Sequence, residues 1–317
     1  MSTVRTGVIG VGHLGYHHAR IYAALEGVEL AGVQDLDAAR GREVASEFGA
    51  PYCASIEELL EKKTEAVSVA VPTVNHHDIV CPLLEAGIDV LVEKPIASTV
   101  DEAQRMVDAA RANGRMLQVG HVERFNGAVI ALSKHFTHPR FIECHRMSPY
   151  PNRGDDVSVV LDLMIHDIDV VLSLVQSEIH SVDAVGVAVF SPQEDIANVR
   201  LRFRDNTVVN LTASRISLER MRKIRIFADD AYVSTDYSEQ EVLVYRRKSD
   251  APEDFESPME LIQIESLPVE KEEPLALELR SFVSSVRERS TPVVSGEDGL
   301  EALKLAFDII QFIREHT

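Results

Sequence analysis

The chain has 317 residues, of which 45% are hydrophobic and 26% charged, a composition typical of a globular protein with room for two domains. A formal net charge of −19 is a poor match to a phosphate backbone and argues against nucleic-acid binding. The sequence has no apolar run of about 18 residues and no secretory leader pattern, so we expect a cytoplasmic protein without a membrane span.

The cysteines Cys53, Cys81 and Cys144 are scattered and form no CxxC pair. This spacing predicts free thiols in a reducing compartment rather than disulfides or a zinc site. Several histidines cluster along the chain, but none joins a Cys or Asp at metal-ligand spacing, so we expect no metal.

Over the first 120 residues, short apolar runs alternate with amphipathic segments. This alternation predicts βαβ units and a parallel sheet covered on both faces. The predicted strands are Val4–Ile9, Val28–Gln34, Glu65–Val71, Ile88–Glu93 and Met116–Gly120. The predicted helices are Gly15–Leu25, Asp37–Phe48, Asn75–Ala86 and Asp101–Asn113. The fold class is therefore α/β, with a doubly wound Rossmann domain expected in residues 1–122.

The second half is richer in strands, and residues 123–317 are predicted to form an α+β domain for substrate binding and oligomerisation. Period-two alternation indicates a mostly antiparallel open sheet. The predicted strands are Asn198–Phe203, Thr207–Ile216 and Lys223–Phe227. The predicted helices are an apolar one near Val157–Val175, one after Pro274, and Glu297–Arg314. The last two helices can pack back on the Rossmann domain.

The glycine-rich segment Gly10-Val11-Gly12-His13-Leu14-Gly15 follows a predicted strand and opens a predicted helix. In that context the glycines permit a tight turn, close approach of a pyrophosphate and close packing of helix on strand. Asp35 follows Gly15 by 20 residues, at the end of the second strand. A carboxylate there accepts hydrogen bonds from ribose hydroxyls and repels a 2′-phosphate, which favours NAD over NADP. The alternative is a ligand-free turn with a surface aspartate.

Two further sets of residues are candidates for catalysis. Lys94 follows the strand Ile88–Glu93, at the edge of the sheet where ligands of doubly wound folds bind, and its ammonium could stabilise a developing alkoxide. Asp162 and His166 share one face of the apolar helix, where His166 could accept a proton while Asp162 orients it. The alternatives are a surface lysine, and a helix-terminal aspartate beside a structural histidine.

Over nearly its full length the chain resembles the Gfo/Idh/MocA oxidoreductase family. The segments that carry the resemblance are GVIGVGHLG, AVPTVNHHDIV, VLVEKPIASTVDEAQ, LQVGHVERFN, LDLMIHDIDVV and SGEDGLEALKLAFDII. The resemblance implies that Lys94 contacts substrate and nicotinamide, that Asp162 and His166 supply the base, and that the open sheet face forms an interface between subunits. It also implies that the cofactor is lined by Pro72, Thr73, His76, Glu93 and Gln118.

Within the family, HVERFN and LDLMIHDID are similar to the subgroup that oxidises the C3 hydroxyl of UDP-N-acetylglucosamine for lipid A. Such a substrate carries a diphosphate, and arginine suits bidentate phosphate contacts. The expected substrate-binding residues are Arg124, Asn126, Arg146 and Arg153. The alternative for each arginine is a solvated surface charge that binds no substrate. Two alternatives stay open: a dehydrogenase of a free sugar or inositol, and a non-catalytic NAD-sensing regulatory protein. We expect a homodimer or homotetramer.

Overall fold

The computed structural model describes residues 3–135, 139–150, 157–249 and 257–316. The chain divides into two compact units, one made of residues 1–122 and 273–303, the other of residues 123–272 and 304–317. The segment 273–303, which the sequence assigned to the second domain with helices able to pack back, belongs to the first unit. Among the described residues, no helix combines the length and apolar character needed to cross a bilayer.

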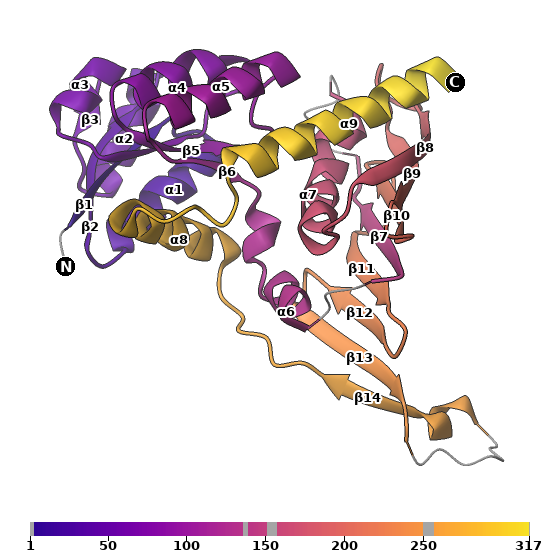
Figure 1. Ribbon diagram of the computed structural model, residues 1–317. Helices are drawn as coiled ribbons and strands as arrows, with labels where there is room; N and C mark the ends of the chain where they lie inside the picture. The colour runs from indigo at the N-terminus through magenta and orange to yellow at the C-terminus, as the bar shows by residue number, and fades with distance from the viewer. Residues whose placement is uncertain (1–2, 136–138, 151–156, 250–256, 317) are drawn as a thin grey trace. The chain divides into compact units, whose positions relative to one another are not determined.

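The first unit contains a six-stranded parallel sheet in the order β3-β2-β1-β4-β5-β6 (Figure 1). This order is that of a dinucleotide-binding Rossmann fold, in which the strand order reverses next to the first strand. The strands are β1 (Val4–Ile9), β2 (Val28–Gln34), β3 (Tyr52–Cys53), β4 (Ala66–Val69), β5 (Asp89–Glu93) and β6 (Leu117–Gly120). β4, β5 and β6 are buried at every position, as expected for strands covered on both faces.

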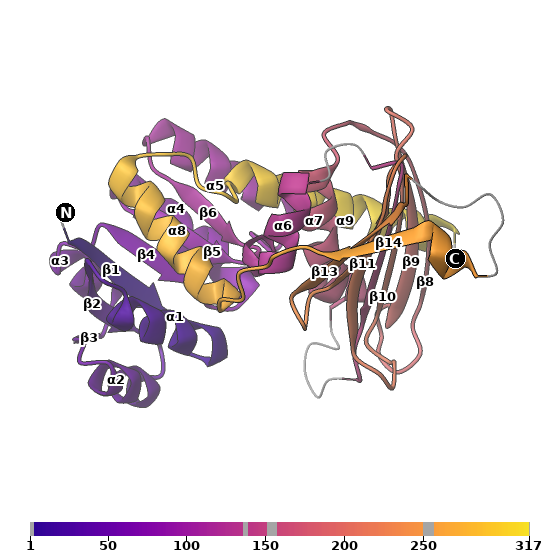
Figure 2. The same ribbon diagram turned by 90° about the horizontal axis from the view of Figure 1, so that it is seen from below.

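Helices cover both faces of this sheet. α1 and α8 pack side by side on one face, and α4 and α5 pack together on the other (Figures 1 and 2). α5 begins with the capping box Thr99–Glu102, in which each side chain binds the backbone N–H of the other residue. The helices are α1 (His13–Ala24), α2 (Ala38–Glu47), α3 (Ile56–Glu61), α4 (His76–Glu85), α5 (Val100–Ala112) and α8 (Pro274–Glu288).

The second unit contains an eight-stranded sheet in the order β14-β13-β12-β11-β7-β10-β9-β8. Every neighbouring pair is antiparallel except β7 with β10, which run parallel. The strands are β7 (Phe141–Met147), β8 (Ile179–Val187), β9 (Ile196–Phe203), β10 (Val208–Ser214), β11 (Met221–Phe227), β12 (Tyr232–Asp236), β13 (Glu241–Arg247) and β14 (Ile262–Ser266). The mostly antiparallel sheet predicted from the sequence is confirmed.

Helices α6 (Gly127–His135) and α7 (Ile165–Leu174) lie on one face of this sheet (Figure 2). Alternate residues of β7 and β9 are buried toward that face, as expected for a sheet with one covered side. The apolar helix predicted near Val157–Val175 is not regular: α7 is preceded by one π-helical turn, Val160–Met164. The last helix, α9 (Gly296–His316), contributes residues to both units.

Candidate active-site residues

The glycine-rich turn between β1 and α1 has the geometry of a phosphate-binding loop. Gly10 has a φ of +80°, and a Cβ there would lie 2.8 Å from the Ala70 carbonyl oxygen. A Cβ on Gly15 would lie 1.8 Å from the Gly10 carbonyl oxygen, so both positions exclude any other residue. Gly12 faces open space, with no atom within 4 Å of an added Cβ, and leaves room for a ligand to approach the backbone.

Asp35, one residue beyond β2, faces this turn. One carboxylate oxygen accepts a hydrogen bond from the Val11 N–H at 2.7 Å, and the other from the Asp37 N–H at 2.8 Å. Each carboxylate oxygen has a second lone pair, so two acceptor positions remain for hydroxyl groups. The carboxylate is thus fixed beside the glycines, where it fits the ribose of a dinucleotide.

Four more of the predicted cofactor residues follow the carboxyl ends of β1 and β4. In a parallel sheet these ends share one edge, which is where dinucleotides bind. His13 and Leu14 occupy the exposed first turn of α1, and Pro72 and Thr73 lie between β4 and α4.

Glu93 and Lys94 lie at the end of β5, at the same edge. The buried carboxylate of Glu93 is 3.0 Å from Nε2 of His18, a fully buried residue of α1. The other Glu93 oxygen accepts the Lys94 backbone N–H at 3.3 Å. Helix α1 therefore helps to fix the backbone from which the partly exposed Lys94 side chain extends.

His76, predicted to line the cofactor, is buried and joins two loops. Its Nε2 is 2.9 Å from the Val71 carbonyl oxygen, and its Nδ1 is 3.1 Å from that of Pro95 and 3.2 Å from that of Ile96. Burial lowers the pKa of His76, although these carbonyl groups act in the opposite direction. Because both ring nitrogens face carbonyl oxygens, the geometry favours a role in positioning the loop after Lys94 over direct contact with a cofactor.

Gln118 of β6 provides a test of whether a cofactor fits. Its side chain is fully buried, and neither its amide oxygen nor its amide nitrogen has a hydrogen-bond partner among the described residues. Buried amides without partners are rare and costly, so a bound ligand or water is needed to complete the site. Together with the Gly12 opening and the fixed Asp35, Gln118 makes the first unit a good match for a dinucleotide.

Asp162 and His166 belong to the second unit, and both are partly exposed. Asp162 lies inside the π-helical turn, and His166 is the second residue of α7. Single π-turns within α-helices are rare and occur frequently at functional sites. The irregular turn therefore supports a special role for this segment, which helical spacing alone did not predict.

Buried ion pairs hold α7 in place. Arg146 of β7 binds Asp167 through two parallel hydrogen bonds, of 2.8 and 2.9 Å, and Glu123 through a third of 2.9 Å. Although burial acts the other way, these carboxylates raise the pKa of Arg146. Arg124 lies 3.4 Å from Asp169, which is on the His166 face of α7.

These contacts change the expectation for two predicted substrate residues. Arg146 is buried and committed to Asp167 and Glu123, so it is a poor candidate for a diphosphate contact. Asn126 is also buried, and its amide donates to the Tyr237 carbonyl oxygen at 3.0 Å. Arg124 keeps 15% of its side chain exposed and remains a candidate. Arg153 lies outside the described residues.

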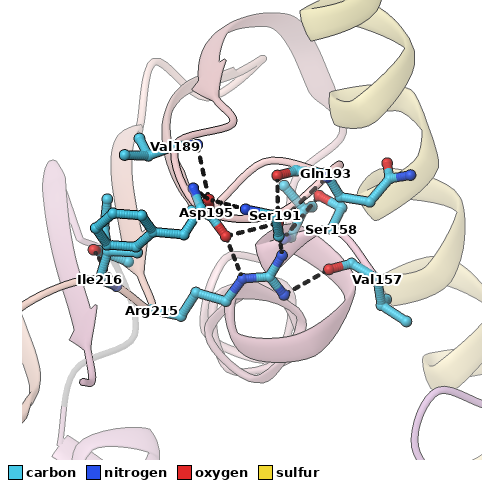
Figure 3. A network of polar contacts seen from close by, with 11 residues as sticks. Val157, Ser158, Val189, Ser191, Gln193, Asp195, Arg215 and Ile216 are labelled. Atoms are coloured by element: carbon cyan, nitrogen blue, oxygen red, sulfur yellow. Dashed lines mark hydrogen bonds and ion pairs between the residues drawn. The ribbon is translucent and has the colours of Figure 1, made fainter. Parts of the chain in front are cut away.

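A second buried ion pair fixes the chain just before the π-helical turn (Figure 3). Arg215, the residue after β10, is fully buried. Its Nε donates to Asp195 at 2.8 Å, and its Nη1 to the Val157 carbonyl oxygen at 2.6 Å. Asp195 also accepts the backbone N–H groups of residues 189–191. Sequence reasoning missed this pair, because its members are 20 residues apart and share no local motif.

The comparisons with known proteins agree with this geometry. Residues 4–121 match the family model described as an oxidoreductase family with an NAD-binding Rossmann fold. Residues 123–234 match the GFO/IDH/MocA C-terminal domain. These matches define the class of the protein as an NAD-dependent oxidoreductase. Among the described residues, no group of three or more potential metal ligands occurs. The chain belongs to the Gfo/Idh/MocA family, as its sequence predicted.

The chain is similar to several dehydrogenases. A UDP-N-acetylglucosamine 3-dehydrogenase from Acidithiobacillus ferrooxidans is 34% identical over 310 residues, which are 98% of this chain and 97% of the relative. A solved structure of that enzyme has a TM-score of 0.91 and covers 99% of each chain. An inositol 2-dehydrogenase from Mycolicibacterium smegmatis is 33% identical over 194 residues, which are 57% of this chain and 56% of the relative.

Proposed function

We propose that this protein oxidises a secondary hydroxyl of a nucleotide sugar to a ketone, at C3 of UDP-N-acetylglucosamine. The observation that carries the proposal is the likeness to a UDP-N-acetylglucosamine 3-dehydrogenase over 98% of the chain, in sequence and in fold. Inositol dehydrogenases make a polyol the second candidate substrate: the one from Mycolicibacterium smegmatis is 33% identical over 57% of the chain, and a scyllo-inositol 2-dehydrogenase of Bacillus subtilis is 26% identical over 93%.

The first unit holds the dinucleotide in this proposal. The N–H groups at the start of α1 face the pyrophosphate, Asp35 accepts the ribose hydroxyls, and Gln118 finds its missing hydrogen-bond partner. When bound, NAD⁺ supplies the nicotinamide ring that accepts hydride from the sugar carbon. Lys94 donates a hydrogen bond to the substrate oxygen and stabilises negative charge as it develops there.

The second unit supplies the proton acceptor. His166 accepts the proton of the hydroxyl group, so that the carbon–oxygen double bond can form as hydride leaves. Asp162, one turn away, orients the imidazole and raises its basicity. The buried pairs Arg146–Asp167 and Arg215–Asp195 keep the segment that carries both residues in a single conformation. Among the arginines that the structure describes, Arg124 is the one that we propose to bind the diphosphate of the substrate.

The test is a panel of substrates with the purified protein, NAD⁺ and a hydrazine trap that removes the ketone. We expect NADH formation with UDP-N-acetylglucosamine, and at least tenfold lower kcat/KM with free N-acetylglucosamine, myo-inositol and scyllo-inositol. Higher kcat/KM with an inositol would replace the first candidate by the second. No NADH with any sugar or polyol, in a protein that still binds NADH, would favour the NAD-sensing regulator.

We propose that the protein acts in the cytoplasm, where it supplies amino sugars for lipid A. We also propose that it forms a homodimer or homotetramer. The support for oligomers is a row of stacked aromatic rings across β7, β11, β12 and β13. Successive ring centroids are 5.5, 4.8 and 5.0 Å apart, and all four rings are partly exposed. An exposed apolar row of this kind favours contact with another subunit. The rings are those of Phe141, Phe227, Tyr232 and Tyr245. Light scattering at micromolar concentration tests the proposal, and a monomer would contradict it.

A further inference from the structure

Arg40, a residue of α2 that the proposed function does not use, contacts the same turn residue as Asp35. Asp35 accepts the Val11 N–H, and Arg40 Nε donates to the Val11 carbonyl oxygen at 3.1 Å. The guanidinium group also donates to Glu43 at 2.8 Å and lies over the Tyr16 ring, 5.3 Å from its centroid. Three contacts thus hold a cation at the adenosine end of the glycine-rich turn.

This guanidinium retains capacity to bind a ligand. Its contacts with described residues use two of its five N–H donors, and a third of its side chain is exposed. A planar group with free, paired donors beside a dinucleotide turn suits the three oxygens of a phosphate. In Rossmann folds, the ribose 2′-phosphate of NADP is accommodated by an arginine close to the end of the second strand.

Three carboxylates oppose such a phosphate, and one of them, Glu43, is paired with Arg40 itself on the surface of α2. Asp35 lies at the proposed ribose position, whereas Asp37 is the N-cap of α2 and accepts the N–H groups of Ala39 and Arg40. Since Asp37 is neutralised in part by the helix N-terminus, Asp35 is the main source of repulsion. The preference for NAD is then a balance of two side chains, one that repels the 2′-phosphate and one that attracts it.

We propose that Arg40 forms a subsite for the 2′-phosphate of NADP(H), which Asp35 keeps weak in the natural chain. The inference depends on the NAD site and not on the identity of the sugar. Removal of the Asp35 charge should therefore convert the protein to one that binds NADP(H) well, through Arg40 and without any new positive charge.

The experiment measures binding of NADPH and NADH by nicotinamide fluorescence, which is free of tryptophan emission because the chain has no tryptophan. The variants are D35N, D35N/R40Q and D35N/R42Q. Arg42 is the matched control, because it lies on the same helix with its guanidinium over the Tyr52 ring, 4.7 Å from the centroid. Both double variants lose one positive charge from α2.

We expect D35N to bind NADPH at least tenfold more tightly than the natural chain, and R40Q to remove at least tenfold of that affinity, more than it removes from NADH. D35N/R42Q should stay within about threefold of D35N, since the Arg42 guanidinium lies over the Tyr52 ring and, among the described residues, makes no hydrogen bond or ion pair with the glycine-rich turn. Equal NADPH affinity for D35N and D35N/R40Q would overturn the proposal. So would an equal loss with R42Q, because it would show an effect of net charge alone.

Asp35 also binds two backbone N–H groups, so a second measurement leaves it in place. Calorimetry compares 2′,5′-ADP with 5′-AMP, two probes that differ by the 2′-phosphate, on the natural chain and on R40Q. The affinity for 2′,5′-ADP relative to 5′-AMP should fall at least fivefold in R40Q, the loss of one charge-assisted contact. An unchanged ratio would show that Arg40 does not contact the phosphate.

Discussion

In the first unit, the candidate cofactor residues are held by the backbone: glycines without side chains make the turn, and N–H groups orient Asp35. In the second unit, the segment with Asp162 and His166 is held by buried charges, with Arg146 on Asp167 and Arg215 on Asp195. The fold around such a pair loses stability when one partner is removed, because the other charge is left buried and uncompensated.

The difference predicts how each unit tolerates substitution. A buried ion pair that loses one member leaves an uncompensated charge in a low dielectric, so the second unit should lose stability when a charge is removed. In the first unit the charged groups lie at an open edge. Changes there should alter the choice of ligand while the fold remains intact, and an added Cβ at Gly10 or Gly15 should be the damaging change.

The largest expected effect comes from Arg215→Met, which leaves Asp195 buried without its cation. We expect the free energy of unfolding to fall by about 3–5 kcal/mol, measured by urea denaturation. Arg200→Met is the control: Arg200 is exposed on β9, donating to Asn210 at 3.0 Å, and should cost no more than about 0.5 kcal/mol. Equal losses for the two variants would refute the special role of the buried pair.

The same pair sets a pH dependence. Burial alone would raise the pKa of Asp195, but hydrogen bonds from backbone N–H groups and from Arg215 lower it well below the usual carboxyl range. A carboxyl pKa that is lower in the folded state contributes stability above its unfolded value, and that stability is lost as pH falls. Arg215→Met should therefore weaken the acid dependence of unfolding below about pH 4.

Lys94→Ala should lower kcat by about 10²-fold or more, because in the proposed mechanism the developing alkoxide loses its cationic hydrogen-bond donor. Steady-state kinetics measure this effect with the sugar of highest kcat/KM. Lys62→Ala, an exposed lysine beyond α3, serves as the control and should keep the turnover of the natural chain. If Lys94→Ala also retained full turnover, Lys94 would be a surface lysine at a strand end.

The sequence predicted the first unit more fully than the second. β1 and β2 have the predicted limits, because the apolar patterns that predict such strands are local. β7 was not predicted, since its sequence FIECHRM places the charged Arg146 on the buried face. That arrangement is stable only because Asp167 and Glu123 lie opposite, which no local pattern reveals.

The candidate site shows the same limit. Spacing made the glycine-rich turn, Asp35, Lys94 and the Asp162–His166 pair candidates, because each has a fixed place after a strand or a short spacing along a helix. It did not reveal His18 as the partner of Glu93, since the pair joins residues 75 positions apart. It also did not predict the π-helical turn, because Val160–Met164 reads as part of an ordinary apolar helix.

After the loss expected for Lys94→Ala, the next largest effect should be the preference for one cofactor over the other. With both carboxylate oxygens of Asp35 fixed at the turn, we expect kcat/KM to be at least tenfold higher with NAD than with NADP, or more than about 1.4 kcal/mol. Initial rates with each cofactor at one ionic strength measure the ratio. Equal rates with the two cofactors would mean that Asp35 does not face the ribose.

Asp162→Asn should have the smallest effect, a loss in kcat on the order of tenfold, because in the proposed mechanism the aspartate acts on His166 and not on the substrate. The amide cannot stabilise a charged imidazole as a carboxylate does, so the basic group seen in the pH profile of kcat should titrate at lower pH. An unchanged profile would assign Asp162 a purely structural role. Full activity in the Asp162→Glu variant would show that a carboxylate at this position is what the reaction requires.

The central claim is that the first unit binds the cofactor while the second supplies the base, and His166→Ala tests it most directly. Turnover and NADH affinity are measured on the same preparation, the first by NADH formation and the second by nicotinamide fluorescence. The account predicts that kcat falls by about 10²-fold or more while the Kd for NADH stays within about threefold. Turnover near that of the natural chain would contradict it and would place the base on another residue.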